Sequence, residues 1–139
     1  MKPLKHVLLI IAIFQAVSTL VGFIELLIKP EWFAPMLSGT FFADHTAIAA
    51  FLLGVCVGSF QWSAVMCHIK YPQWLPLAHT LAGLVMVGWI AGECLVINSF
   101  TWPHALWGGI ALLQLGLVLG LLGVHQPFVA NTKNFRRVE

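Results

Sequence analysis

The chain has 139 residues, of which 60% are hydrophobic and only 9% are charged, and its formal net charge at pH 7 is +2. A soluble domain carries roughly 25% charged residues, so this composition, with a mean hydropathy of +0.92, argues against a soluble protein and predicts a small integral membrane protein. The lipid bilayer is the expected partner, and the small net charge gives no reason to expect nucleic acid.

Four apolar runs are long enough to cross a bilayer, because a spanning helix needs about 20 residues. They cover approximately residues 7–28, 45–67, 75–98 and 103–124. The short connections after the second and third runs require antiparallel neighbours. We therefore predict an all-α fold, a four-helix transmembrane bundle running up-down-up-down over residues 1–125, followed by a polar cytoplasmic tail at 126–139.

The residues between the runs suit helix ends. Asp44 is a suitable N-cap for the second helix, and Pro76 and Pro103 suit the first turns of the third and fourth helices. The longest connection, from Lys29 to Asp44, is rich in aromatic residues and poor in charge. We expect it to lie in the outer membrane interface and to contain a short helix.

The distribution of lysine and arginine predicts the orientation, because cytoplasmic loops carry the excess of these residues. With the N-terminus inside, Lys29 is the single basic residue outside and the other six of the seven are inside. We expect a bacterial inner-membrane protein with both termini in the cytoplasm.

Each predicted helix brings one titratable side chain to a common level near its outer end. These side chains are Glu25, His45, Glu93 and His104. At 1.5 Å per residue their levels agree within roughly 10 Å. Four further residues lie close enough to support such a site: Asp44, Trp89, Asn98 and Trp107. An ionisable group inside a spanning helix is expensive, so this layer is the leading candidate functional site.

Several chemistries could use this layer. Two carboxylates and two imidazoles could hold a divalent transition metal, although the Glu-x-x-His pairs of di-metal bundles are absent from the sequence. His45 and His104 could instead be axial ligands of a b-type haem. A buried carboxylate could hold or relay a proton, and a Glu–His pair could perform acid–base chemistry on a lipid-like substrate. The same groups could also be interhelical hydrogen bonds with no further role.

The leading interpretation is therefore a membrane protein whose outer-leaflet site binds a metal, haem or small ligand, with proton-linked binding as one option. A second interpretation is an accessory subunit that docks into a larger membrane complex, or a homo-oligomer, through Gly-x-x-x-Gly faces. These patterns are Gly54–Gly58, Gly88–Gly92 and Gly116–Gly120. A third is an enzyme acting on a lipid- or quinone-like substrate. The sequence leaves open whether the protein is catalytic and which cofactor, if any, it uses.

A candidate inner site lies at His79, about one turn inside the inner end of the third helix and on nearly the same face as Glu93. Gln15, Gln61 and Gln114 are apolar-run residues that could supply polar groups midway, or interhelical hydrogen bonds.

The segment from Thr19 to Leu37, TLVGFIELLIKPEWFAPML, resembles the first helix and following loop of small bacterial DoxX-like membrane proteins. Those proteins also have four helices and about this length. The resemblance implies a four-helix architecture and carries no functional residue onto this chain.

Overall fold

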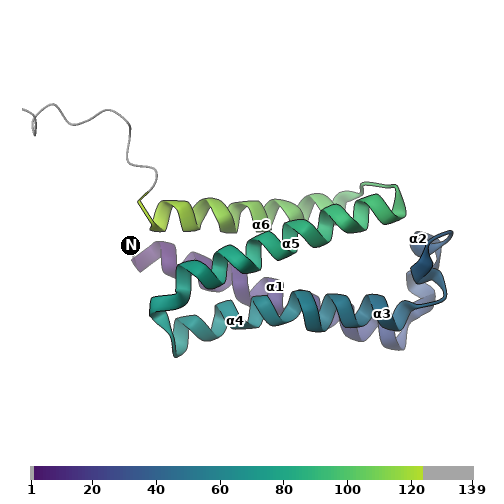
Figure 1. Cartoon of the computed structure of the whole chain (residues 1–139), viewed down its shortest axis with the longest axis horizontal. Helices are drawn as coiled ribbons and strands as arrows, with labels where there is room; N and C mark the ends of the chain where they lie inside the picture. Colours follow the sequence, from purple (N-terminus) through teal and green to yellow (C-terminus); the bar gives the residue numbers. More distant parts are fainter. Residues whose placement is uncertain (1, 124–139) are drawn as a thin grey trace, which may run out of the picture.

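The structure is a computed structural model that describes residues 2–123. The regular structure in this range is entirely helical (Figure 1). Its elements are α1 (Lys2–Ile28), η1 (Pro30–Trp32), α2 (Ala34–Leu37), η2 (Phe41–Ala43), α3 (Thr46–Phe51), η3 (Leu52–Val57), α4 (Gly58–Ile69), η4 (Pro72–Trp74), α5 (Leu75–Ile97) and α6 (Trp102–Leu121). The predicted tail at 126–139 lies outside the described residues.

Four spans are long and apolar enough to cross a membrane, and they form an all-α four-helix bundle, as predicted. At two ends the observed helices differ from the approximate predicted ranges by a few residues. The first helix already begins at Lys2, because Pro3 lies in its first turn, where proline is tolerated. The last helix ends at Leu121, just before Gly123, whose φ of 73° stops the helix.

Neighbouring spans are antiparallel and form a ring in the order α1, the continuous α3–η3–α4 span, α5 and α6 (Figure 1). The start of α1 and the end of α6 lie at one end of the bundle, and the segment around α2 lies at the other. We call these the inner and outer ends, after the expected orientation.

The connection between the first two spans is ordered as three short helices, which confirms the predicted short helix. It folds onto the outer end, where Leu37 of α2 is buried with Leu26 and Ala49. The predicted Asp44 cap is wrong, because His45 occupies the N-cap position of α3 and no side chain caps that end.

The second span contains a π-helical section, Leu52–Val57, which the sequence analysis did not predict. Here the span lies very close to α1: a Cβ added to Gly54 would be 2.5 Å from the Phe23 ring, and one added to Gly22 would be 2.7 Å from Leu53. Glycine permits this approach because it has no side chain. The Gly54–Gly58 pattern therefore packs inside the bundle.

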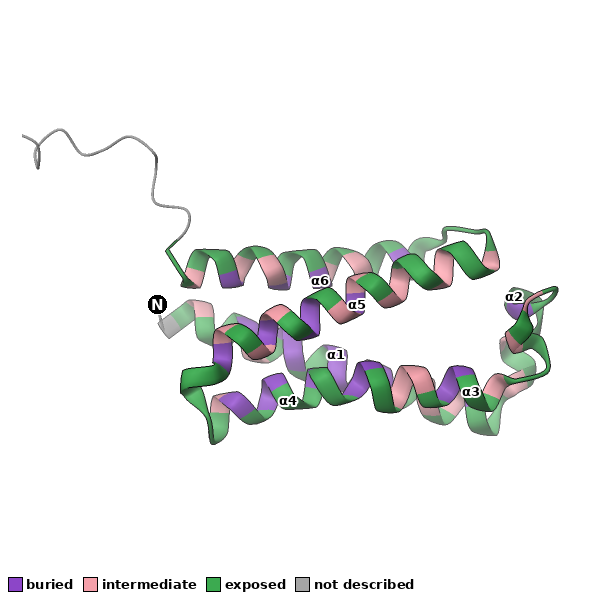
Figure 2. Ribbon diagram, viewed as in Figure 1, coloured by how far each residue is buried: buried purple, intermediate pink, exposed green. Residues whose placement is uncertain are grey.

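The other glycine patterns are less enclosed. Nothing lies within 4 Å of a Cβ added at Gly88, Gly92 or Gly116. Buried residues are most frequent in the inner half of the bundle (Figure 2). There Ala12 and Ala16 of α1 pack with Ala64 and Ala82, so small side chains bring the helices together.

Candidate functional site

A cavity of about 660 Å³ lies in the outer half of the bundle, between α1, α5 and α6. Its walls are mainly aliphatic and aromatic side chains, and Phe33 and Met36 of the outer connection also line it. Its polar lining side chains are Ser18, Thr19, Glu25, Glu93, Thr101 and His104. An apolar cavity of this size with a few polar groups is typical of small-molecule sites.

The packing of α1 against α6 explains where this cavity begins. At the inner end, Leu8 of α1 is buried against Val118 of α6. Further out, the Phe14 ring stacks on the Trp107 ring at 6.2 Å between centroids. Both rings line the cavity, and Met86 of α5 lines it while being almost fully buried. The cavity is thus closed toward the inner half.

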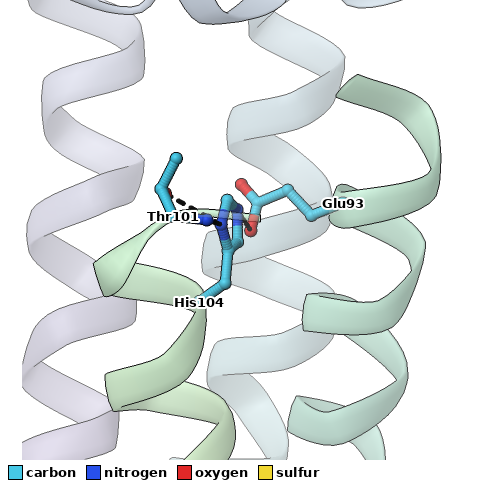
Figure 3. A network of polar contacts seen from close by, with 3 residues as sticks. All are labelled: Glu93, Thr101 and His104. Carbon is cyan, nitrogen blue, oxygen red and sulfur yellow. Dashed lines mark hydrogen bonds and ion pairs between the residues drawn. The ribbon is translucent and has the colours of Figure 1, made fainter. Parts of the chain in front are cut away.

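The polar end of the cavity is formed by a contact between α5 and the first turn of α6 (Figure 3). Nε2 of His104 lies 3.8 Å from Oε2 of Glu93. His104 is 4% exposed, whereas the Glu93 side chain is 26% exposed. Trp89, one turn before Glu93 on α5, also lines the cavity.

Thr101 determines which nitrogen of His104 carries the proton. Thr101 is the N-cap of α6 and His104 is its N3 residue, and together they form a capping box. The backbone N–H of Thr101 donates to Nδ1 of His104 at 3.0 Å, and Oγ1 of Thr101 lies 2.9 Å from the same nitrogen. An amide N–H can only donate, so Nδ1 must present its lone pair. The neutral imidazole therefore carries its hydrogen on Nε2, toward Glu93.

This tautomer does not fit the metal or haem candidates. A metal ion or haem iron needs the lone pair of Nε2, which is protonated when Nδ1 accepts the Thr101 amide. Within residues 2–123, no group of three or more His, Cys, Asp or Glu side chains is placed to hold a metal ion. The chain's own residues are thus better suited to donate a hydrogen bond here than to coordinate a metal.

The structure brings together five of the predicted site residues around this cavity. They are Glu25, Trp89, Glu93, His104 and Trp107. Glu25 lies on the same lining face of α1 as Ser18 and Gly22.

Three predicted residues lie outside the cavity lining. The His45 ring is exposed and stacks on Phe41 at 4.3 Å, with Nδ1 3.0 Å from the Phe41 carbonyl oxygen. Asp44 is exposed beside it. Asn98 is also exposed and has a φ of 49°, so it ends α5 in the left-handed conformation. The two predicted haem ligands therefore do not face a common space.

The apolar walls were not identified from the sequence. Phe14, Met36 and Ile90 come from three different elements and are ordinary residues in apolar runs. The sequence offered only a weak indication of these walls. Phe14 is one turn before Ser18 on α1 and therefore lies on the same face of the helix as the polar residues.

His79 belongs to a different cluster, about two turns further in along α5 than Met86. It is fully buried, and its two ring nitrogens contact Gln114 and His68.

Comparison of the sequence and the structure with protein-family models, with curated proteins and with solved structures gives no match. Arguments about function therefore depend on the geometry of these sites.

Proposed function

We propose that this protein binds a small amphipathic molecule, quinone- or lipid-like, in the cavity between α1, α5 and α6. The observation that carries the proposal is the Nε2 atom of His104 facing Glu93 at the polar end of a mainly apolar cavity. We further propose that both termini face the cytoplasm of a bacterium, so that this cavity lies in the outer leaflet of its inner membrane.

The walls suit the apolar part of such a molecule. Aromatic and aliphatic side chains such as Phe14, Ile90 and Trp107 would replace its contacts with lipid tails. Because lipid is as apolar as these walls, apolar contact alone would give little preference for the cavity over the bilayer. Binding must therefore depend on the polar end.

The polar end offers both a donor and an acceptor. The Nε2–H of His104 can donate to a carbonyl-type oxygen, and the Glu93 carboxylate can accept from a hydroxyl group. Their separation of 3.8 Å is longer than a hydrogen bond, so these atoms can both turn to a ligand oxygen. In a site of low dielectric, hydrogen bonds of this kind are stronger than in water.

A binding titration tests this function. Trp89 and Trp107 line the cavity, so a short-tailed benzoquinone should quench tryptophan fluorescence of the full chain in lipid nanodiscs saturably. A lysophospholipid should compete if the site also accepts lipid. His104→Phe should weaken quinone binding about tenfold, and Glu93→Gln should weaken binding of the corresponding hydroquinone, which has hydroxyl donors, by a similar factor, since a hydrogen bond to a charged or buried group contributes about 1.5 kcal/mol.

The matched control is Glu31→Gln, which changes an exposed carboxylate in η1 outside the cavity lining. It should bind the quinone as the wild type does. Non-saturable quenching, or equal affinity in all three variants, would overturn the proposal. Metal analysis and a visible spectrum of the same sample test the alternatives: a stoichiometric metal or a haem band would contradict the His104 tautomer argument.

A further inference from the structure

Each of the four spans places one fully buried polar side chain in the inner half of the bundle. These are Gln15, Gln61, His79 and Gln114. The packing puts them at similar heights: Nε2 of Gln61 donates to the Ala82 carbonyl oxygen at 3.0 Å, and Ala16 is in the same buried cluster as Ala82. His79 is the ionisable member of this layer, and an ionisable side chain within a spanning segment marks a functional site by default.

His79 is held in this layer by two contacts. Nε2 of Gln114 lies 2.9 Å from Nδ1 of His79. On the other side of the ring, Nε2 of His79 lies 2.8 Å from Nε2 of His68 on α4. Two ring nitrogens at this distance need one hydrogen between them, because two hydrogens would collide and none would leave the lone pairs opposed.

The pair has one buried and one accessible side. His79 is 0% exposed, whereas His68 is half-buried near the inner end of the bundle. The charge of Lys5, and that of His6 when it is protonated, oppose a positive charge on His68. Cys67, whose thiol is buried, is its neighbour in the chain. On the buried side, Gln114 of α6 faces His79. Protons can therefore reach the pair through His68.

The Gln114 side chain also carries a hydrogen-bond acceptor, Oε1, beside the NH2 donor that contacts His79. In the described part of the chain its Oε1 is buried and has no hydrogen-bond partner. Turning the carboxamide by half a revolution would bring Oε1, an acceptor, to Nδ1 of His79 in place of the NH2 donor. In either orientation one atom of the carboxamide has no hydrogen-bond partner, so the cost of that missing hydrogen bond is similar in the two orientations.

We propose that His68 and His79 form a site that binds one proton from the inner end of the bundle, with Gln114 turning to stabilise each state. The neutral pair holds two ring hydrogens: one is shared between the Nε2 atoms, and the other is on Nδ1 of His68, while Nδ1 of His79 accepts from Gln114. Moving that second hydrogen to Nδ1 of His79 gives the alternative neutral form.

Adding one proton to either neutral form gives the same cation. It has hydrogens on both Nδ1 atoms and one between the Nε2 atoms, and Nδ1–H of His79 donates to Oε1 of Gln114. The Nε2–Nε2 contact is kept throughout. A second proton would place two hydrogens between the rings and break the contact, so the capacity is one.

This site is separate from the cavity described above. Met86, buried with Val57 and Ala111, lies between the two regions along α5. The inference therefore stands independently of the proposed ligand in the outer cavity.

Nuclear magnetic resonance of full-length protein labelled with ¹⁵N-histidine, in lipid nanodiscs, tests it. In the wild type we expect a scalar coupling across the hydrogen bond between the Nε2 atoms of His68 and His79. On acidification both rings should change together as one proton is taken up, and the coupling should persist. Two independent uptake steps, or no coupling at neutral pH, would overturn the proposal.

Variants test the part played by Gln114. Gln114→Met removes the side-chain bond to Nδ1 of His79 in both states, but the bond to the protonated pair is charge-assisted and roughly twice as strong. The proton affinity should therefore fall severalfold. Gln61→Met is the matched control, because Gln61 is equally buried but bonds to Ala82 instead of His79. Equal titrations of the two variants contradict the role of Gln114. The wild-type measurement decides the capacity of the pair even if Gln114→Met does not fold.

Discussion

The backbone amide of Thr101 donates to Nδ1 of His104 at 3.0 Å, so a helix cap selects the chemistry that the imidazole offers to the cavity. The ring is almost fully buried and turns Nε2 toward Glu93. The first turn of α6 and the polar end of the cavity share these residues, so a change to the cap should affect both.

Thr101→Val should separate these two effects. It removes the hydroxyl that caps the first turn of α6 but keeps the backbone N–H that bonds Nδ1. Loss of an N-cap costs about 1 kcal/mol, so thermal unfolding in detergent should occur at a lower temperature. The ¹⁵N shifts of His104 should still report Nε2–H. A switch of His104 to the other tautomer contradicts our assignment of the amide as the controlling donor.

The close approach of α1 and the second span should be sensitive to a single methyl group. Gly54→Ala would place Cβ at 2.5–2.6 Å from atoms of Phe23, so the spans must separate, and overpacking of this kind costs about 1–3 kcal/mol. Gly88→Ala is the control, because it meets open space. The unfolding temperature should fall for Gly54→Ala and stay unchanged for Gly88→Ala. Equal stability of the two variants would show that the spans are further apart than described.

Gln15 should be replaceable by an apolar residue. Both of its amide atoms are buried without a partner in the described part of the chain, and such groups cost about 1–3 kcal/mol each. Gln15→Leu, of similar volume, should therefore raise the unfolding temperature. Gln61→Leu should gain less, since it also loses the bond to Ala82. A destabilised Gln15→Leu would mean that the carboxamide has a favourable partner in the membrane.

Filling the cavity should abolish ligand binding without unfolding the bundle. Ser18 lines the cavity on α1, and Ser18→Phe would occupy part of its volume. Ser59→Phe makes the same change at an exposed position of α4 outside the lining. In the fluorescence titration we expect weakened quinone binding for Ser18→Phe only. Unchanged binding in Ser18→Phe would place the binding site elsewhere.

Much of the architecture is local and could be read from the chain. Runs of apolar residues near membrane length, separated by prolines, predict four spans and their antiparallel order, and Pro76 and Pro103 do lie in the first turns of their helices. Depth along a helix follows from counting residues, which is why Glu93 and His104 were correctly expected at one level. The resemblance to DoxX-like proteins and the orientation in the membrane remain predictions.

Other features depend on contacts that helical periodicity does not describe. His45 has the depth of a site residue, yet its ring turns to Phe41, and Asn98 is used to end a helix. The π-helical section of the second span arises where Gly54 meets Phe23. Sequence periodicity assigns a residue to a face of its own helix, but the identity of the helix opposite, and the rotamer that contact selects, come from packing.

Composition and spacing were thus sufficient for the number of spans, their approximate lengths and the approximate height of each ionisable group, because these follow from a bilayer of given thickness and a helix of given rise. The approach of His104 to Glu93, the pairing of His68 with His79 and the shape of the outer cavity were decided only when the helices packed. Each of these depends on which atoms of two helices come within hydrogen-bonding or van der Waals distance, and no one-dimensional pattern encodes such distances.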